Sequence, residues 1–411
     1  MTAQAGLAEY IPVTGEGVVA ELRLLGERMA GKRVLNVNST KAGGGVAEIL
    51  NRMVPLLREI GIDARWEVLR GTEEFFALTK NLHNALHGVP FNPTARDRQI
   101  YNEVTEDNLN SLDLDADFLF MHDPQPAGLV KARDGRAGHW VWRCHIDLSA
   151  PSPQAWEFIA PMVERYDLSV FSAPQFARTM EAPQVLIAPS IDPLSDKNRE
   201  LSQSEIEAIL ERYGIRSEKP IVTQVSRFDR LKDPVGVIKA WRMARERFDC
   251  QLILVGGGAT DDPEGAAVLK EVREQADDDP DVHILDLPPT SHLEINAIQR
   301  ASAIVLQKSL KEGFGLTVSE ALWKFKPVIA SAVGGIPLQV THKYSGILTH
   351  TIEGTAFWIK QLLGAPDFAK RLGENGHAHV RTNFLLTRHI RDYLLAFLFA
   401  ASGEKGDVIR L

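Results

Sequence analysis

Apolar strand-like runs alternate with helical patterns along this chain, and the alternation occurs twice. The first series lies at residues 33–40, 63–70, 117–123, 140–147, 168–173 and 185–189, and the second at 221–228, 251–255, 282–287, 303–307, 327–332 and 346–349. Between the runs, apolar residues recur every three or four positions, which is the period of an amphipathic helix. The second series is apolar on both faces, as in buried parallel sheets made of βαβ units. We therefore expect an α/β protein with two doubly wound, Rossmann-like domains.

The pattern lapses between residues 189 and 218, where Pro, Ser and charged residues dominate and one short helix, 205–213, is expected. We interpret this segment as the connection between an N-terminal domain at 1–190 and a C-terminal domain at 191–384. The two domains should face each other across a cleft. Because open parallel sheets bind ligands outside the carboxyl ends of their strands, the loops after the strands are the candidate sites.

Composition excludes several classes of protein. The length of 411 residues suits two or three domains, and 44% hydrophobic with 24% charged residues is typical of globular chains. The net charge of −8, without long runs of either sign, argues against nucleic-acid and membrane partners. Only Cys144 and Cys250 are present, which fits a reducing compartment. The start lacks a secretory signal and the longest apolar run is 393–401, so we expect a cytoplasmic protein.

Three consecutive glycines, Gly43, Gly44 and Gly45, follow the first run and precede a helix. Such a loop lets the backbone approach an anion at a helix N-terminus, although a tight turn explains it equally well. No Gly-Lys-Ser/Thr ending follows, so it is not a nucleotide P-loop. A second cluster, 256–258, lacks the GxGxxG spacing, which argues against a nicotinamide cofactor.

Two cations follow the run at 221–228. In the segment SRFDRLKDP, Asp233 is a plausible N-cap with Pro234 at the first helical position, which leaves Arg227 and Lys232 in the turn. An Arg guanidinium can bind two phosphate oxygens at once, and a Lys side chain carries its positive charge on a flexible stem. Arg227 and Lys232 together therefore suit a diphosphate. A solvated basic turn is the alternative.

Two carboxylates follow the run at 303–307, within EGFGLTVSEAL. A helix should begin near Gly315 or Leu316, which leaves Glu312 in the loop and Glu320 in the second turn. Carboxylates accept hydrogen bonds from paired sugar hydroxyls, so the two can address separate parts of one ligand. The alternatives are a surface acid at Glu312 and a helix-dipole role for Glu320.

These motifs together resemble the retaining glycosyltransferases of family 4, which have the GT-B fold. The resemblance rests on EGFGLTVSEAL at 312–322, SRFDRLKDP at 226–234 and the glycines before residue 46, and it covers nearly the whole chain. More narrowly, MHDPQPAGL at 121–129 and WRCHIDLS at 142–149 resemble the trehalose glycosyltransferring synthases. Members of that group join glucose from a nucleoside-diphosphate glucose to free glucose, reversibly in some cases.

The resemblance implies roles for individual residues. A catalytic part is implied for His145, Arg227, Lys232 and Glu312. Donor binding is implied for Gly44, Gly45, Ser226, Arg227, Lys232, Gly313, Phe314, Gly315, Leu316 and Glu320. Acceptor binding is implied for His122, Asp123, Gln125 and His145. A structural histidine at 145 and a Pro-bracketed turn at 122–126 are the alternatives for the acceptor side.

The implied donor is ADP-, UDP- or GDP-glucose, with no cofactor required. An Asp-x-Asp pattern occurs at Asp113, Asp115 and Asp117, but it precedes a strand, so we interpret it as a polar loop and predict no metal site. The resemblance leaves Mg²⁺ and a homodimer open. It also implies that the C-terminal helices, about 385–411, pack back on the first domain.

Other functions fit parts of the pattern. A related transferase with a different acceptor, of the sucrose or sugar-phosphate synthase type, shares the same motifs. A sugar-nucleotide epimerase has a similar paired α/β architecture, and a glycoside hydrolase could use Glu312 and Glu320 as acid and nucleophile. A non-catalytic sugar-nucleotide sensor is the alternative outside the enzymes.

Overall fold

The computed structural model describes residues 5–41, 45–257 and 263–402. The chain divides into two units of α/β structure. Unit 1 takes the chain up to Ser190 together with the segment from Leu386 onward, and unit 2 is Ile191–Leu385. Each unit contains one six-stranded parallel sheet with alternating helices, so the predicted α/β fold class is confirmed.

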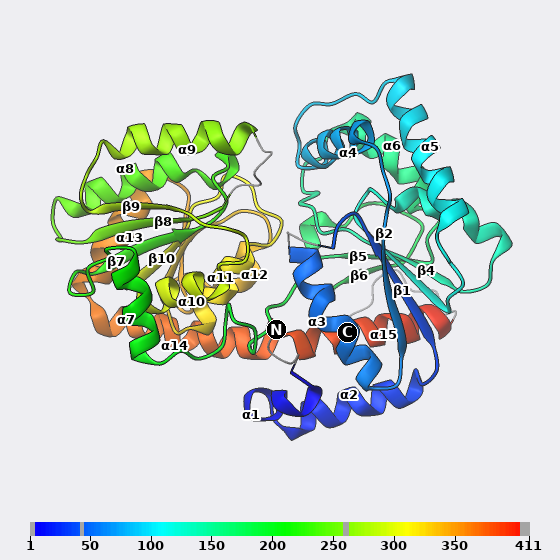
Figure 1. Ribbon diagram of the computed structural model, residues 1–411, viewed down its shortest axis with the longest axis horizontal. Helices are drawn as coiled ribbons and strands as arrows, with labels where there is room; N and C mark the ends of the chain where they lie inside the picture. Colours follow the sequence, from blue (N-terminus) through cyan, green and yellow to red (C-terminus); the bar gives the residue numbers. More distant parts are fainter. Residues whose placement is uncertain (1–4, 42–44, 258–262, 403–411) are drawn as a thin grey trace. The chain divides into compact units, whose positions relative to one another are not determined.

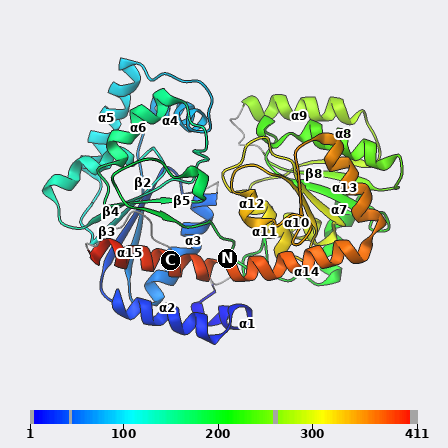
Figure 2. The ribbon, with the colours of Figure 1, turned by 180° about the vertical axis from the view of Figure 1, so that it is seen from behind.

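The sheet of unit 1 has the strand order β2-β1-β3-β4-β5-β6. Its strands are β1 (Arg33–Asn38), β2 (Asp63–Val68), β3 (Phe118–His122), β4 (His139–Arg143), β5 (Leu168–Phe171) and β6 (Gln184–Leu186). Its longer helices are α2 (Glu16–Arg28), α3 (Gly45–Glu59), α4 (Glu73–Leu86), α5 (Ala95–Ser111), α6 (Pro153–Val163) and α15 (Leu386–Ser402). Figures 1 and 2 show α4, α5 and α6 on one face of the sheet and α2, α3 and α15 on the other.

Aromatic packing fixes α15 against the sheet of unit 1. The ring of Phe120 on β3 meets Tyr393 edge-on at 4.8 Å, and Phe118 lies 5.1 Å from Phe397. All four rings are at most 2% exposed, so they are removed from water almost completely. Burial on this scale contributes about 1.5–3 kcal/mol per large apolar side chain, which explains why the last helix belongs to the first unit.

The sheet of unit 2 has the strand order β12-β11-β10-β7-β8-β9. Its strands are β7 (Ile221–Val225), β8 (Gln251–Gly256), β9 (Val282–Asp286), β10 (Ile304–Gln307), β11 (Val328–Ser331) and β12 (Ile347–Thr349). Its helices include α7 (Gln203–Arg212), α8 (Pro234–Arg245), α9 (Pro263–Ala276), α10 (His292–Ala301), α11 (Leu316–Trp323), α12 (Ile336–Gln339), α13 (Ile352–Gly364) and α14 (Pro366–Asn383). One apolar cluster joins α8, α9 and α13 to the sheet, and a second joins α7 and α10 to it.

All twelve predicted strands are present, and most end earlier than predicted because the apolar runs continue into the loops. The first ends at Asn38 rather than at residue 40, and the seventh at Val225 rather than at 228. β7 and β10 are hydrogen-bonded neighbours in parallel, with Ile304 opposite Val222. The loops that follow these two strands therefore leave the same edge of the sheet next to each other.

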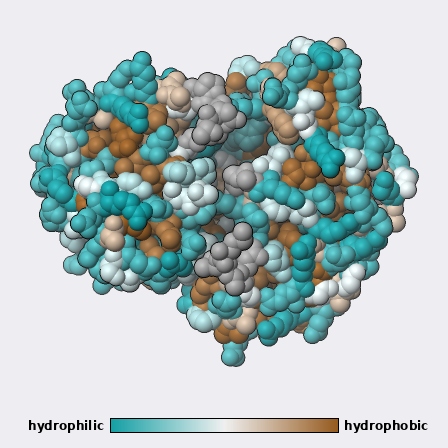
Figure 3. Space-filling model, in the orientation of Figure 1, coloured by the Kyte–Doolittle hydropathy of each residue, from teal (hydrophilic) through white to brown (hydrophobic). Residues whose placement is uncertain are grey.

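The described surface carries large apolar side chains singly or in small groups. The exposed ones are Leu24, Phe76, Val89, Leu186, Leu310, Phe325, Tyr344 and Phe357. The face in Figure 3 likewise shows hydrophobic residues in groups separated by hydrophilic ones. No helix within the described ranges is long and apolar enough to cross a membrane.

Candidate functional site

The loops after β7 and β10 meet through a Lys–Glu ion pair in unit 2. Lys232 Nζ lies 2.5 Å from Glu312 Oε2, and the two side chains are only 19% and 11% exposed. The same oxygen accepts hydrogen bonds from Gln307 Nε2 at 3.2 Å and Ser309 Oγ at 3.0 Å. Three donors therefore converge on Oε2, and the described residues offer Oε1 none.

Main-chain and side-chain bonds join these two loops. Gln224 Nε2 donates to the Lys232 carbonyl at 2.9 Å, while Gln224 Oε1 accepts from the Lys308 amide at 2.9 Å. The Leu310 amide donates to the Leu231 carbonyl at 2.7 Å. Lys232 and Glu312 are thus set by a network that extends to the sheet rather than by their own contact alone.

The start of α8 agrees with the sequence prediction. Asp233 caps the helix, its Oδ1 accepting from the Gly236 amide at 3.0 Å, and Pro234 is the first helical residue. Asp233 has a left-handed backbone with φ 47° and its carboxylate also pairs with the Lys308 ammonium. The sharp turn places Lys232 directly before the N-cap of α8.

Arg227 lies in the loop after β7 with an exposed side chain. Its side chain is 63% exposed, and its partner is the Asp229 carboxylate at 3.3 Å. Ser226 is tied to the sheet, because its amide donates to the Val255 carbonyl at 3.0 Å. A Cβ atom on Gly256 would stand 1.9 Å from the Ser226 carbonyl oxygen. Gly256 is therefore required by the close approach of β8 to the loop after β7, which gives it a structural role without a nicotinamide cofactor.

The segment 313–316 forms the N-terminus of α11. Gly315 is the N-cap with φ +80° and Leu316 is the first helical residue, as predicted. The Gly313 carbonyl accepts from the Gly335 amide at 3.1 Å, and the Phe314 carbonyl accepts from Gln339 Nε2 at 2.5 Å. The carbonyl oxygens of the segment are held by the protein, while the helix start carries partial positive charge suited to an anion.

Glu320 lies in the second turn of α11 and is 5% exposed. Its carboxylate lies 3.6 Å from Lys197 Nζ, a partner that sequence reasoning missed. Lys324 Nζ donates to the Glu320 carbonyl at 3.0 Å and to Asn198 Oδ1 at 2.9 Å. Burial lowers the pKa of Lys324 to about 7, opposed by the Glu320 carboxylate. Glu320 is therefore a buried acid with a cation beside it, and its predicted role in donor binding stays a prediction.

In unit 1, two histidines meet at the carboxyl edge of the sheet. His122 Nδ1 lies 3.1 Å from His145 Nε2, and His122 Nε2 lies 3.1 Å from Asn36 Oδ1. Asp123 follows β3 with φ 69°, and its Oδ1 accepts from the His145 amide at 2.7 Å. The Asp123 carbonyl accepts from Trp142 Nε1 at 2.9 Å. Asp123 and His145 are therefore fixed to each other, and His122 has both ring nitrogens engaged.

Burial keeps the two histidines of this cluster uncharged and shifts the pKa of Asp123. The pKa of His122 is lowered to about 3, by burial first and then by the Arg143 guanidinium. The same causes lower the pKa of His145 well below its ordinary value. Burial raises the pKa of Asp123 to about 6, against the opposing effects of the His145 amide and Arg143. Arg143 is fully buried and donates to Ser172 Oγ at 3.0 Å.

Asn36 and Arg143 were missed by sequence reasoning. Both are polar residues inside strand runs that are otherwise largely apolar, RVLNVN and HWVWR, and that interruption was the available signal. Burying a polar group costs free energy unless it is hydrogen-bonded, so a polar residue in a buried strand indicates a partner or a role.

The remaining residues predicted for the site are Gln125, in the turn at 124–128, and Gly44 and Gly45, which precede and begin the helix α3. Tyr101 Oη donates to the Pro124 carbonyl at 2.6 Å and accepts from the Gly128 amide at 3.1 Å. The buried Oε1 of Gln125 finds no donor within the described ranges. Gly45 is the first residue of α3, whereas Gly44 lies outside the described residues.

The aspartates before β3 form a polar loop, as predicted. Asp113 pairs with Arg65 at 2.6 Å, Asp115 with Arg33 at 2.5 Å, and Asp117 accepts from the Arg33 amide at 2.9 Å. Within the part of the chain that the structure describes, no group of three or more His, Cys, Asp or Glu residues is arranged to hold a metal ion.

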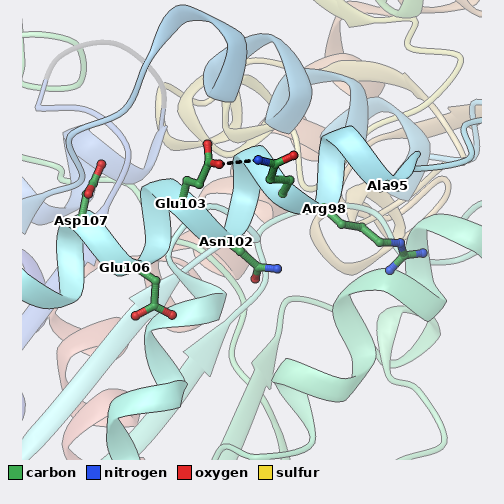
Figure 4. A pocket seen from close by; sticks show the side chains of 7 residues that line it. Ala95, Arg98, Asn102, Glu103, Glu106 and Asp107 are labelled. Carbon is green, nitrogen blue, oxygen red and sulfur yellow. Dashed lines mark hydrogen bonds between the residues drawn. The ribbon is translucent and has the colours of Figure 1, made fainter.

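A separate hollow of about 600 Å³ runs along α5. Figure 4 shows that its side chains come from this one helix and include Glu103, Glu106 and Asp107, with Gln99 Nε2 donating to Glu103 Oε1 at 2.7 Å. It contains none of the predicted site residues, and its acidic lining does not suit a diphosphate.

The two doubly wound parallel sheets form the GT-B fold. Similar folds occur in sucrose-phosphate synthase from Thermosynechococcus elongatus, with TM-score 0.69 and 17% identity over 90% of this chain and 100% of that one. The trehalose-6-phosphate synthase OtsA gives TM-score 0.70 and 13% identity over 91% and 99%. HepE from Anabaena, solved in complex with UDP-glucose, gives TM-score 0.68 and 18% identity over 90% of this chain and 100% of that one. At these identities the likeness shows the fold.

More narrowly, the chain belongs to the trehalose synthase family. Residues 36–178 match the trehalose synthase N-terminal domain, and residues 205–379 match the glycosyl transferases group 1 domain. The trehalose synthase of Pyrococcus horikoshii is 44% identical over 394 residues, covering 94% of this chain and 95% of that one. The trehalose synthase of Rubrobacter xylanophilus is 44% identical over 401 residues, covering 95% and 96%. The protein is thus a trehalose-related glycosyltransferase.

Proposed function

We propose that this enzyme transfers glucose from a nucleoside-diphosphate glucose to glucose, forming trehalose with retention of the α configuration. The observation that carries the proposal is the Lys232–Glu312 pair, which joins the loops after two neighbouring strands of a chain from the trehalose synthase family. The exposed Arg227 lies in the same loop as Lys232. A cation pair and an acid at one sheet edge match the diphosphate and the sugar of such a donor.

The leaving diphosphate gains negative charge as its bond to the sugar breaks. Arg227, Lys232 and the N-terminus of α11 stabilise that charge by preorganised electrostatics, usually the largest contribution to such catalysis. A Lys ammonium has three donors and Glu312 uses one of them, so the others can reach phosphate oxygens. This arrangement supplies the positive charge without a metal ion.

The carboxylates of Glu312 and Glu320 bind the uncharged parts of the donor, which are the glucose and the ribose. Three donors occupy Glu312 Oε2, which leaves Oε1 to accept from hydroxyls of the donor glucose. Glu320, with Lys197 beside it, accepts from the ribose hydroxyls. Ser226 and the segment 313–316 provide the remaining donor contacts, together with the glycines at 44 and 45.

The acceptor glucose is held by groups of unit 1. Asp123 and His145 are locked together through the His145 amide and present a carboxyl group and an imidazole at the end of β3 and β4. Gln125 adds a buried side-chain oxygen that lacks a donor within the described ranges. The neutral imidazole of His145, the amide oxygen of Gln125 and the carboxyl oxygens of Asp123 can all accept hydrogen bonds from sugar hydroxyls.

The donor is expected among ADP-, UDP- and GDP-glucose. A solved neighbour, HepE, is in complex with UDP-glucose, which supports a nucleotide-sugar donor for this fold. Attack on the sugar from the face of the leaving group, with the leaving phosphate as base, accounts for retention without a covalent intermediate.

The test is a product assay. Purified protein is incubated with each of the three donors and ¹³C-glucose, and the mixture is followed by NMR and by nucleotide release. The expected product is a non-reducing α,α-linked disaccharide formed only when donor and glucose are both present. No nucleotide release with any donor refutes the proposal. Nucleotide release or donor isomerisation without added glucose indicates a hydrolase or an epimerase, and calorimetric binding without turnover indicates a sensor.

A further inference from the structure

Asn36, His122 and His145 form a hydrogen-bonded chain across unit 1. Asn36 lies on β1, His122 ends β3, and His145 follows β4, and these three strands are neighbours in the sheet. Both links measure 3.1 Å between heavy atoms, from Asn36 Oδ1 to His122 Nε2 and from His122 Nδ1 to His145 Nε2. Asn36 and His122 are each 2% exposed, so neither side chain reaches a sugar directly.

The orientation of the Asn36 amide is fixed by its other end. Asn36 Nδ2 donates to the Arg65 carbonyl on β2 at 3.4 Å, which turns Oδ1 toward His122. An amide oxygen can only accept, so the proton of that link must belong to His122 Nε2. The direction of the first hydrogen bond is therefore determined by the sheet.

The surroundings keep each ring neutral, with a single N–H. Among the described residues, the charged and titratable groups that act on the two rings are Arg143 on β4 and His389 on α15, and the carboxyl group of Asp123 holds the His145 amide. Burial and Arg143 lower the pKa of His122 to about 3 and hold the pKa of His145 well below its ordinary value. With its proton on Nε2, His122 accepts at Nδ1, so His145 must donate from its own Nε2.

We propose that Asn36 is a positioning residue which, through His122, fixes His145 in the tautomer protonated on Nε2. The Nδ1 atom of His145, to which no described residue donates, then carries a lone pair and accepts a hydrogen bond from a sugar hydroxyl. That a sugar is the ligand rests on the proposed function, whereas the tautomer of His145 follows from hydrogen bonds within the protein. In this scheme His122 does not contact the acceptor, and its hydrogen bonds determine which ring nitrogen of His145 carries the proton.

The Asn36→Asp substitution separates this role from a merely structural one. A carboxylate at this position stabilises the His122 imidazolium, whose Nδ1 then carries a proton and donates toward His145 Nε2. His145 must move its own proton to Nδ1 and loses its acceptor. As the pH rises past the raised pKa of His122, that extra proton leaves and the original proton order returns. Asp123, whose pKa is raised to about 6, titrates in both proteins, so the variant is compared with the parent at each pH. The recovery relative to the parent is the effect of the substitution.

The experiment combines ¹⁵N NMR of histidine-labelled protein with kinetics. In the parent protein, His145 is expected to be protonated on Nε2 and unprotonated on Nδ1 across neutral pH. For N36D we expect kcat to fall about 10²-fold near pH 6, the range of general acid–base effects, and to recover to within about threefold near pH 9. Asn38→Asp is the matched control, because it places the same charge two residues further along β1, where the Asn38 side chain contacts Trp66 and Thr40 instead of His122. It should show no such recovery.

Several outcomes overturn the proposal. A parent spectrum with the His145 proton on Nδ1 contradicts it without any variant, so a misfolded N36D does not leave the question open. A loss of activity in N36D that is the same at every pH also contradicts it. If no glucose transfer is detected with any acceptor, the proposed function fails while the NMR spectrum still decides the tautomer.

Discussion

Replacing Arg227 with alanine should remove much of the catalytic rate while leaving the fold intact. Its side chain is 63% exposed and its partner, Asp229, also caps the short turn at 230–232 through the Leu231 amide. No buried group loses its partner in Arg227→Ala, so the free energy of unfolding should change by less than about 0.5 kcal/mol. The loss of a donor to the leaving diphosphate should cost about 2–4 kcal/mol of transition-state stabilisation.

The assay is the initial rate of nucleotide release with donor and glucose, at donor concentrations that give kcat and kcat/KM separately. A loss of about 2–4 kcal/mol corresponds to roughly 30- to 1,000-fold in kcat/KM. Thermal unfolding of the same preparation checks that the variant is folded.

Arg230→Ala is the matched control. Arg230 lies three residues further in the same loop, its side chain is 61% exposed, and it pairs with Glu271 at 3.0 Å. The substitution removes the same charge from the same loop without touching the predicted phosphate contact, so its rate should stay within about twofold of the parent. If Arg227→Ala and Arg230→Ala have equal rates, the diphosphate assignment is wrong.

Three further substitutions or conditions give measurable outcomes. Lys232→Ala should lower the free energy of unfolding by about 1–2 kcal/mol as well as the rate, because Glu312 keeps only neutral donors; denaturant titration measures it. Gly256→Ala should cost about 1–3 kcal/mol by thermal unfolding, because the new methyl would overlap the Ser226 carbonyl. Below about pH 6.5 stability should fall, because the unfolded chain binds a proton at each histidine whereas the pKa of His122 is about 3 in the folded protein; each such histidine contributes about 1.4 kcal/mol per pH unit.

Each of these outcomes has a control within the chain. Glu312→Gln combined with Lys232→Ala should recover part of the stability lost, because the unpaired charge is gone. Gly135→Ala should be nearly neutral, since nothing lies within 4 Å of a Cβ there.

Burial raises the pKa of Asp123, so this residue takes up a proton in the folded protein as the pH falls below about 6 and opposes the loss of stability in acid. Asp123→Asn should therefore steepen the fall of stability below pH 6, and a shallower slope contradicts the reasoning.

The sequence predicted the local features of the fold because local features have local causes. Strand positions follow from continuous apolar runs. The start of α8 follows from Asp233–Pro234 and the start of α11 from Gly315, and both N-cap residues, Asp233 and Gly315, have a left-handed backbone. The place of the Asp-x-Asp pattern at 113–117 before a strand predicts a polar loop, and the hydrogen bonds of the three aspartates confirm it. None of these inferences needed a partner distant in sequence.

Contacts across strands could not be predicted, because they depend on the order of the strands in the sheet. Lys232 and Glu312 are eighty residues apart and meet only because β10 pairs with β7. The link from Asn36 to His122 likewise requires β1 beside β3, an order that alternation of strands and helices does not determine. The predicted roles of these residues in binding and catalysis stay predictions.

The two candidate sets differ in charge in a way that physical chemistry explains. In unit 2 the cations Arg227 and Lys232 remain at least partly exposed, so they avoid the full cost of desolvation and keep the charge that a diphosphate requires. In unit 1 His145 is kept neutral, and burial raises the pKa of Asp123. A sugar hydroxyl gains little from a charge and much from a correctly directed lone pair, so fixing a tautomer is worth more there than adding an ion. On this reasoning, substitutions in unit 2 should respond to ionic strength, whereas Asn36→Asp should respond to pH.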